Sequence, residues 1–241
     1  MGYFSRRRVS QFAIFVSLLL AQPVAASDMH LDVEVGTELP IALGLSVGLE
    51  WPNGLRASSS AGYLPGRYVA LINEVVQSVP NSYDSTTGDL IEETLQDSLI
   101  WRTHIGWQLP YGMYADAGYG LAALGGGTST EALLAGLTGR AAPSTSGNAR
   151  TYAVGSTLHM LDAEFGWKRV YRERFTVRAA IGVAATVAAT ATVEADSKPN
   201  QSARRRLIEE FESFSERYLV DTYTTYMFSP VITMSLGYRL F

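Results

Sequence analysis

Hydrophobic and polar residues alternate along much of the chain, and the last stretch shows this clearly. From Tyr226 to Phe241, nearly every second residue is apolar or aromatic, while serine, threonine, glycine and arginine occupy most positions between them. Successive side chains of a strand point to opposite faces, so a period of two predicts a β-strand and not a helix. The same alternation recurs upstream, where it predicts the partners of this strand.

Eight strands follow from this alternation. The stretch Leu31–Trp51 has apolar residues at nearly all odd positions, but it is too long for one membrane strand of ~10 residues. We expect it to fold back at Glu38–Pro40, because proline lacks the amide donor of a sheet; one long strand kinked at the proline is the alternative. The other predicted strands are Leu55–Leu64, Leu99–Leu109, Met113–Leu124, Thr157–Lys168, Phe175–Ala188 and Tyr226–Phe241.

Short and long connections alternate between these strands. Pro52-Asn53-Gly54 and Pro110-Tyr111-Gly112 are typical of three-residue hairpin turns with glycine in the left-handed conformation, and Arg169–Arg174 is the third short connection. The long connections, Pro65–Asp97, Gly125–Arg150 and Glu194–Asp221, contain helical spacing. The last predicts an amphipathic helix whose apolar face consists of Leu207, Ile208, Phe211, Phe214 and Tyr218.

The final five residues, Gly237-Tyr238-Arg239-Leu240-Phe241, resemble the terminal strand of bacterial outer-membrane β-barrels. That family usually ends on phenylalanine two residues after an aromatic residue, and here Leu240 intervenes. The resemblance implies an all-β fold, an eight-stranded antiparallel transmembrane up-and-down β-barrel with helical extracellular loops, in the outer membrane of a Gram-negative envelope. It also implies insertion by the barrel assembly machinery, with Gly237, Tyr238 and Phe241 as the assembly signal.

Residues 1–26 predict an export signal, with Arg6–Arg8, an apolar run from Phe12 to Ala21 and the small-residue cleavage site Val24-Ala25-Ala26. The apolar run is shorter than the ~20 residues that span a bilayer, so we expect residues 27–241 to form the barrel domain; twin-arginine export is the alternative route. Removing three arginines changes the formal charge from −4 to −7, which disfavours nucleic acid as a partner. With no cysteine, disulfides and thiolate metal sites are excluded, and we expect no cofactor or metal.

Aromatic residues on the apolar face predict two interfacial girdles. Trp51, Trp107, Trp167 and Tyr238 belong to the one near the short turns, and Tyr63, Trp101, Tyr119 and Phe228 to the one near the long loops. A soluble barrel such as a lipocalin, whose apolar face points inward, is the alternative. The opposite face favours lipid, because it combines glycines with most of the strand charges, as a narrow filled interior requires. We therefore expect a monomer surrounded by outer-membrane lipid.

Charged residues of this second face are predicted to pair inside the barrel, since buried charges are costly alone. Counting from the turns sets Glu50 against Arg56, Glu164 against Arg178 and His104 against Gly118, and closure brings Arg239 beside Asp32 or Glu34. The predicted network is Asp32, Glu34, Glu50, Arg56, Arg102, His104, Asp116, Asp162, Glu164, Arg178 and Arg239. A proton-conducting path through His104 and Asp116 is the alternative.

His159, close to Ser156, is the candidate for lipid-modifying chemistry, but no spacing combines a base, a nucleophile and an orienting carboxylate. We therefore expect a non-catalytic, structural or surface-interaction role, with a porin-like narrow pore or a carrier of small or hydrophobic molecules as the second hypothesis. Arg204, Arg205 and Arg206 are candidates for contact with lipopolysaccharide phosphates. Ion pairs with nearby glutamates of the same helix are the alternative for these arginines.

Overall fold

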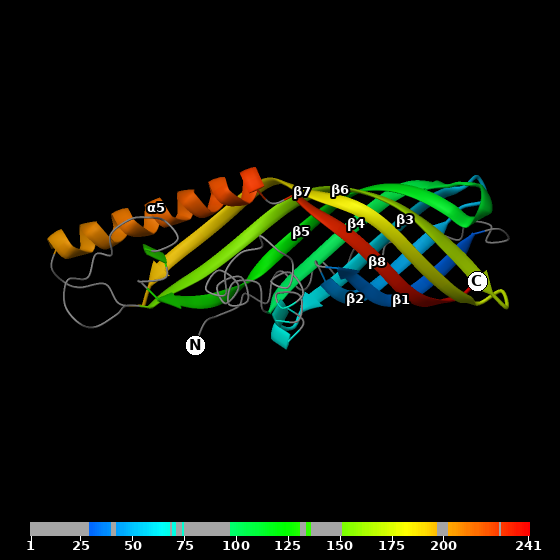
Figure 1. Cartoon of the computed structure of the whole chain (residues 1–241), viewed down its shortest axis with the longest axis horizontal. Helices are drawn as coiled ribbons and strands as arrows, with labels where there is room; N and C mark the ends of the chain where they lie inside the picture. The colour runs from blue at the N-terminus through cyan, green and yellow to red at the C-terminus, as the bar shows by residue number, and fades with distance from the viewer. Residues whose placement is uncertain are drawn as a thin grey trace.

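The computed structural model describes residues 29–39, 42–67, 69–70, 74, 97–130, 134–135, 151–196, 202–226 and 228–241. Its strands are β1 His30–Leu39, β2 Ala42–Glu50, β3 Leu55–Leu64, β4 Ser98–Gln108, β5 Met113–Thr130, β6 Thr151–Tyr171, β7 Phe175–Ala195 and β8 Phe228–Arg239, with the turn η1 at Pro110–Gly112 and the helix α5 at Ser202–Tyr226. Each strand pairs antiparallel with its neighbour in sequence, and β1 pairs with β8, which closes the barrel (Figure 1). The predicted eight-stranded up-and-down barrel is confirmed, and the resemblance to small outer-membrane barrels holds for the fold. The predicted export signal, residues 1–26, lies outside the described residues.

The division of the first apolar stretch into two strands is also confirmed. β1 and β2 pair antiparallel from His30↔Glu50 to Glu38↔Ala42, so they form a hairpin and not one long strand. Other predicted registers hold as well, since Glu50 pairs with Arg56 and Asp32 with Arg239. In the β4–β5 hairpin, Arg102 lies opposite Gly120 and His104 lies opposite Gly118.

The β6–β7 hairpin differs from the prediction. Its turn begins after Tyr171, which pairs with Phe175, so Trp167 lies opposite Ala179 and Glu164 opposite Gly182. The predicted pairing of Glu164 with Arg178 is therefore wrong as a register. The charged residues Arg169–Arg174 predict a connection, whereas β6 continues through three of them.

The turns show why particular residues occupy them. Gly54 and Gly112 have φ of 83° and 79°, the left-handed conformation predicted for both. In the β6–β7 turn, Arg172 and Glu173 have φ of 51° and 64°, and Arg174 N donates to Tyr171 O over 3.2 Å. Two consecutive left-handed residues form a type I′ turn, in which Asn-Gly is the favoured pair.

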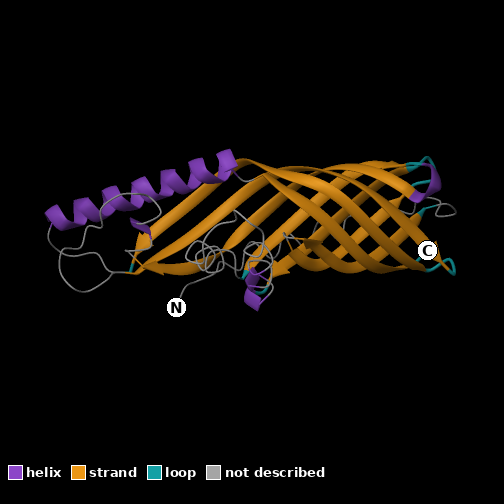
Figure 2. Ribbon diagram, in the orientation of Figure 1, coloured by secondary structure: helices purple, strands orange, loops and turns teal. Residues whose placement is uncertain are grey.

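Three strands continue well beyond the closed part of the barrel and form a ledge, defined here as residues 125–130, 151–157 and 186–195 (Figure 2). These strands extend beyond the predicted bounds at Leu124, Thr157 and Ala188, so parts of the predicted loops are strand. β8 pairs with β7 only as far as Ala185, so the edge of β7 beyond this point has no strand partner in the described chain.

Helix α5 covers this edge. Ile208 and Phe211 are buried against Tyr152 and Val193 of the ledge, in agreement with the predicted helix. Leu207 and Tyr218 are 52% and 37% exposed, so the predicted apolar face was too wide.

Two glutamates of α5 provide the edge with hydrogen-bond partners. Val193 N donates to Glu216 Oε1 over 3.0 Å, and Ala195 N donates to Glu212 Oε1 over 2.8 Å. The helix therefore accepts hydrogen bonds from the β7 edge, as the backbone of a further strand would. It protects an edge that could otherwise pair with another chain. Within the described residues, no helix has both the length and the hydropathy needed to cross a bilayer.

Large apolar side chains of the barrel point outward. Ile181, Leu236 and Leu45 are 60% or more exposed. The same outward face of the strands includes Val33, Val35, Leu43, Val47, Leu99, Ile105, Trp107, Leu161, Phe165, Phe175, Val183, Val187, Ile232 and Met234. Because the alternate positions are buried, this protein has an apolar exterior and a polar interior.

Candidate functional site

The interior of the barrel holds the predicted charged residues. Asp32, Arg102 and Arg178 are 0%, 1% and 6% exposed, and Arg239 is half-buried. The other predicted members are also buried: Glu34, Glu50, Arg56, His104, Asp116, Asp162 and Glu164. All eleven belong to strands, and glycines opposite several of them leave room for the long side chains. A Cβ at Gly118, for example, would lie 2.5 Å from both Asp162 Oδ1 and His104 Cδ2.

The lowest layer, nearest the short turns, is centred on Lys168. Its Nζ lies 2.5 Å from Asp32 Oδ2 and 2.7 Å from Glu50 Oε1. Arg239 contacts the same two carboxylates, with Nε 3.1 Å from Asp32 Oδ1 and Nη2 2.9 Å from Glu50 Oε2. Because β6 is not a neighbour of β1 or β2, Lys168 joins opposite walls of the barrel. Sequence reasoning missed this residue, although it has the inward parity of Glu164 and Gly166.

The middle layer links Arg178 of β7 to two carboxylates. Arg178 Nε lies 3.0 Å from Glu34 Oε2, and Nη1 lies 3.6 Å from Glu164 Oε1. The predicted partners Glu164 and Arg178 thus meet diagonally, although they are not opposite each other. Ser235 Oγ donates to Glu34 Oε2 over 2.6 Å, and Thr233 Oγ1 donates to Glu164 Oε2 over 2.9 Å. Hydroxyl groups on β8 therefore donate further hydrogen bonds to these buried carboxylates.

Tyr114 is a second interior residue that sequence reasoning missed. It is fully buried, its hydroxyl donates to Glu164 Oε1 over 2.6 Å, and its ring lies 3.7 Å from the Cζ atom of Arg56. Arg56 Nε also lies 3.4 Å from Asp116 Oδ2. The sequence indicates the inward position of Tyr114, because this residue is two positions from Asp116 and therefore on the same face of β5.

The upper layer surrounds Arg102. Its Nη1 lies 2.5 Å from Glu38 Oε2 and its Nε 3.2 Å from Asp162 Oδ2. His104 Nε2 lies 2.6 Å from Asp162 Oδ1. His104 therefore contacts Asp162, whereas Asp116, the other residue of the alternative proton-conducting path, pairs with Arg56. Glu38 was missed because its position was assigned to a turn.

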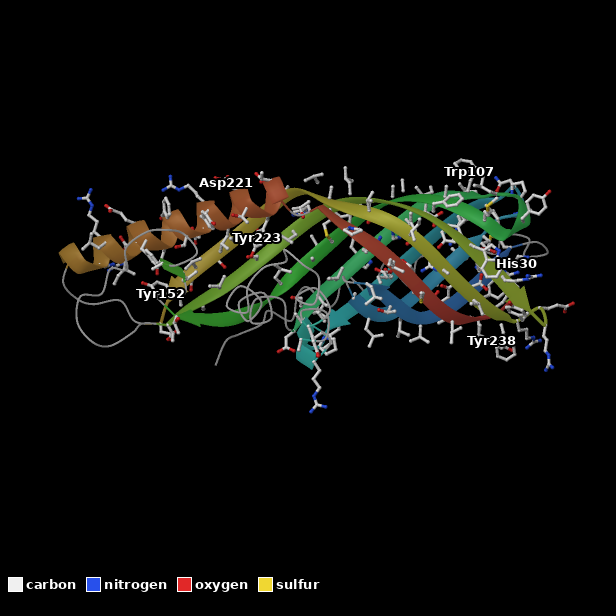
Figure 3. All side chains as sticks on the ribbon, in the orientation of Figure 1. His30, Trp107, Tyr152, Asp221, Tyr223 and Tyr238 are labelled. Atoms are coloured by element: carbon white, nitrogen blue, oxygen red, sulfur yellow. The ribbon has the colours of Figure 1, made fainter. Side chains whose placement is uncertain are left out.

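Apolar side chains close the interior above these ion pairs. The cluster contains Ala42, Leu64, Val69, Ile100, Ala122, Leu124, Leu158, Met160, Ala184, Tyr223 and Val231. Tyr223 comes from the end of α5, where it lies over the mouth of the barrel (Figure 3), and its hydroxyl lies 3.3 Å from Ser156 Oγ as a hydrogen-bond acceptor. Burial raises the pKa of this tyrosine, which lies outside the strands.

Two of the spaces in the described barrel lie among its interior charged residues. One of about 580 Å³ opens at the short-turn end, where His30, Gln108 and Lys168 are among its lining residues. The other, about 20 Å³, lies between β1, β2, β3, β7 and β8, and Glu38 and Arg178 are among the residues around it. The smaller space has room for about one water molecule.

The aromatic residues of the predicted lower girdle lie near one end. Trp107 pairs with Leu55, Trp167 with Met113, and Tyr238 with Phe175, all close to short turns. Figure 3 shows Trp107 and Tyr238 pointing away from the barrel at the end where His30 lies. Trp51 is half-buried and lines the larger space.

The predicted upper girdle is less uniform. Tyr63, 39% exposed, lies near the top of β3, and its hydroxyl bonds to Asp97. Trp101 and Tyr119 lie closer to the short turns than an upper girdle would, because Leu99, on the same face of β4 as Trp101, is exposed and lies nearer the long loops. Trp101 Nε1 donates to Ser59 Oγ over 2.9 Å. The side chain of Phe228 lies outside what the structure describes.

The remaining candidates are separate from the interior. His159 Nδ1 lies 2.5 Å from the Tyr119 hydroxyl on the outer surface, whereas Ser156 is buried. The described structure therefore does not join His159 to the serine that was the candidate nucleophile.

The arginines of α5 lie toward the far end of the ledge. Arg205 pairs with Glu209 at 2.9 Å and Arg206 with Glu210 at 3.5 Å. The side chain of Arg204 is outside the described residues. Of the proposed assembly signal, Gly237 lies in β8 opposite Glu34, while Phe241 O accepts a hydrogen bond from Leu31 N over 3.2 Å.

Comparisons with known proteins find similarity in architecture. No protein-family model matches the sequence, and no curated protein matches it. Among solved structures, the N-terminal β-barrel domain of Pseudomonas aeruginosa OprF is 10% identical to this chain, with a TM-score of 0.38. The alignment covers 88% of this chain and 97% of that domain. Acinetobacter baumannii CarO2 is 11% identical with a TM-score of 0.38, and a major outer membrane protein from Thermus thermophilus is 13% identical with a TM-score of 0.40; each covers 88% of this chain and 98% of that one.

Proposed function

We propose that this protein spans the outer membrane as a β-barrel whose lumen is filled by ion pairs, and that its role is structural or surface-interactive and not catalytic. The observation that carries the proposal is the inversion of burial: the largest fully buried side chain is Arg102, while Ile181 and Leu236 are 66% and 63% exposed. Burial of apolar surface drives folding in water, so a wall of this kind favours a hydrocarbon surrounding.

The height of the apolar wall supports this environment. On β4, the exposed residues Leu99 and Trp107 are eight positions apart, which at ~3.3 Å per residue and a tilt of ~40° is about 20 Å along the barrel axis. On β7, Phe175 and Val187 are twelve positions apart, or about 30 Å by the same estimate. These values bracket the ~25 Å apolar band of outer-membrane barrels.

The filled lumen supports a structural role. Each layer pairs cations with carboxylates at 2.5 to 3.6 Å, and the apolar cluster under Tyr223 lies above them. Eight strands enclose a space that side chains can just fill. The proposed partners are therefore lipids around the wall, the barrel assembly machinery during insertion, and lipopolysaccharide near the loops, with Arg204–Arg206 as the candidate contact; we propose a monomer.

Heat-modifiability on a detergent gel, combined with membrane fractionation, tests the proposal. We expect a folded form in the outer-membrane fraction that migrates differently from its boiled counterpart. A protein recovered in the soluble fraction, with no band shift, would refute the membrane location.

A narrow pore is the second candidate, favoured by the space of about 580 Å³ at the short-turn end. In the described interior, seven carboxylates outnumber five lysine and arginine cations. The carboxylates are Asp32, Glu34, Glu38, Glu50, Asp116, Asp162 and Glu164, and the cations are Arg56, Arg102, Lys168, Arg178 and Arg239. An open path would therefore select cations. Planar-bilayer recordings of the wild type and Arg102→Ala test it, and a silent wild type removes the pore.

A further inference from the structure

The β6–β7 turn carries a concentration of exposed cations. Arg169, Arg172 and Arg174 are all exposed, and with Glu173 they give this hairpin end a formal charge of +2 (three arginines minus one glutamate). The other two short turns at this end of the barrel, residues 52–54 and 110–112, contain no charged residue. The charge is therefore confined to one side of the barrel end. We call Arg169, Arg172 and Arg174 the turn patch.

Within the described residues, no carboxylate oxygen forms an ion pair with an arginine of the turn patch. The interior arginines each have a carboxylate at 3.4 Å or less, and Arg205 and Arg206 of α5 pair with glutamates. None of the three turn-patch arginines has such an ion pair in the described chain. Their positive charge thus remains available to an anion from outside the protein.

Aromatic side chains orient the turn patch. Arg174 Nη1 donates to the Tyr238 hydroxyl over 2.8 Å, and its Cζ lies 5.9 Å from the centre of the same ring. The Cζ of Arg169 lies 5.9 Å from the Trp167 ring and 6.0 Å from the Tyr171 ring. A guanidinium has five N–H donors in a planar fork that matches phosphate, so an arginine held against a ring can still bind an anion in bidentate fashion.

The aromatic rings also set the depth of the turn patch. Tyr171, Phe175 and Tyr238 are 48%, 55% and 36% exposed, and the apolar wall of β7 and β8 begins beside them with Leu236. Aromatic side chains prefer the boundary between hydrocarbon and head groups. Cations that lie just beyond such rings are at the level of lipid phosphates, with apolar wall alongside for the acyl chains.

Backbone conformation gives an independent indication. Arg172 and Glu173 are both left-handed, with φ of 51° and 64°, in a turn type that Asn-Gly forms with less strain. A long charged residue at such a position is disfavoured by the turn itself. A non-glycine residue in this conformation is often associated with a functional requirement.

We propose that the turn patch binds the phosphate of an anionic phospholipid in the leaflet that surrounds the short turns. The inference rests on the membrane location proposed above and adds a lipid class and a side of the barrel. The ligand is a lipid head group and not free phosphate, because the patch adjoins the apolar wall.

Native mass spectrometry of the purified, detergent-folded protein tests this inference. Phosphatidylglycerol and phosphatidylcholine with identical acyl chains are added in equal amounts, and the retained lipid adducts are compared. The wild type is expected to retain about a hundredfold more phosphatidylglycerol, the order expected for three arginines near an anionic surface. The triple variant Arg169→Gln, Arg172→Gln, Arg174→Gln is expected to lose this preference.

A control removes positive charge elsewhere. Arg67→Gln and Arg217→Gln together change two exposed arginines that lie outside both the turn patch and the proposed lipopolysaccharide contact, and this variant is expected to keep the wild-type preference. Equal preference in the wild type and the turn-patch variant, or a loss confined to the Arg67/Arg217 variant, would overturn the inference. Complete competition by inorganic phosphate at equimolar concentration with the lipid would also overturn it, since the ligand would then be the free anion.

The two proposals fail in different ways. Heat-modifiability is recorded on each sample, and a wild type without a band shift would count against the membrane barrel itself. A wild type that shifts but retains both lipids equally would count only against the turn patch. If the triple variant lacks the shifted band, Arg172→Gln alone serves instead, because its guanidinium has no hydrogen-bond or ion-pair partner in the described chain; about a fivefold loss of preference is then expected, the effect of one arginine.

Discussion

Ile181→Arg is a sharp test of which side of the wall faces lipid. Ile181 is 66% exposed and lies six residues from both Phe175 and Val187, the ends of the apolar stretch of β7, so it occupies the middle of the band. Its cross-strand partners, Phe165 and Ile232, are also apolar and exposed. In a bilayer, an arginine at the midplane of a barrel wall costs ~2–4 kcal/mol, which is roughly a 30- to 900-fold change in the folding equilibrium.

The same substitution on a water-facing surface costs no more than ~0.5 kcal/mol. The measurement is urea unfolding and refolding in phospholipid vesicles, followed by tryptophan fluorescence and by the folded band on a gel. Val187→Arg is the matched control, because it is 53% exposed at the loop end of the band and should cost ~0–1 kcal/mol. A cost below ~0.5 kcal/mol at both positions would show that the wall is not in hydrocarbon, and equal large costs would refute the proposed depth.

Four further predictions concern the interior and the helix. Gly118→Ala should destabilise by ~1–3 kcal/mol in the same assay, because its Cβ meets two side chains at 2.5 Å, whereas Gly48→Ala, whose nearest neighbours lie at 4.0 Å, should be nearly neutral. Lys168→Met should cost ~3–5 kcal/mol, since it removes one of the two cations that neutralise Asp32 and Glu50 and leaves Arg239 alone to pair with both; a cost under ~1 kcal/mol would contradict the proposed ion pairs. Glu212→Ala should release α5 from the strand edge and cost ~1.5–3 kcal/mol locally, seen as faster proteolysis of the helix. Because burial raises the pKa of Tyr223, its contribution is present below the ordinary tyrosine pKa of ~10 and is lost as the pH rises through the raised value; Tyr223→Phe should abolish this alkaline loosening of α5.

Alternation predicted the barrel well where the outward residues are large. β1, β2 and β4 have leucine, valine, isoleucine and tryptophan on one face, and their bounds differ from the prediction by one or two residues. The signal weakened in the ledge, where β7 reads Ala-Ala-Thr-Ala-Thr and both faces have similar side chains. Strand length there depends on pairing and on cover by α5, which no local pattern reports.

The interior shows a similar division. Parity along each strand identified the charged residues that point inward, and hairpins with proline-glycine turns gave the correct register. It could not identify Lys168 as a central cation, because its partners belong to strands on the other side of the barrel. Nor could it place Glu164 relative to Arg178, because a charged turn of unknown length separates them. Contacts across the lumen depend on the curvature of the whole sheet.

The ion pairs of Lys168 on β6 with Asp32 on β1 and Glu50 on β2 have a consequence for assembly of the barrel. In an open, incomplete sheet in the proposed membrane location, these groups would lie far apart, and each charge would face lipid without a partner. Only closure of the ring brings them within reach of one another. We therefore expect intermediates that lack a wall segment to be poorly populated, and closure of the ring to be cooperative with pairing of these charges.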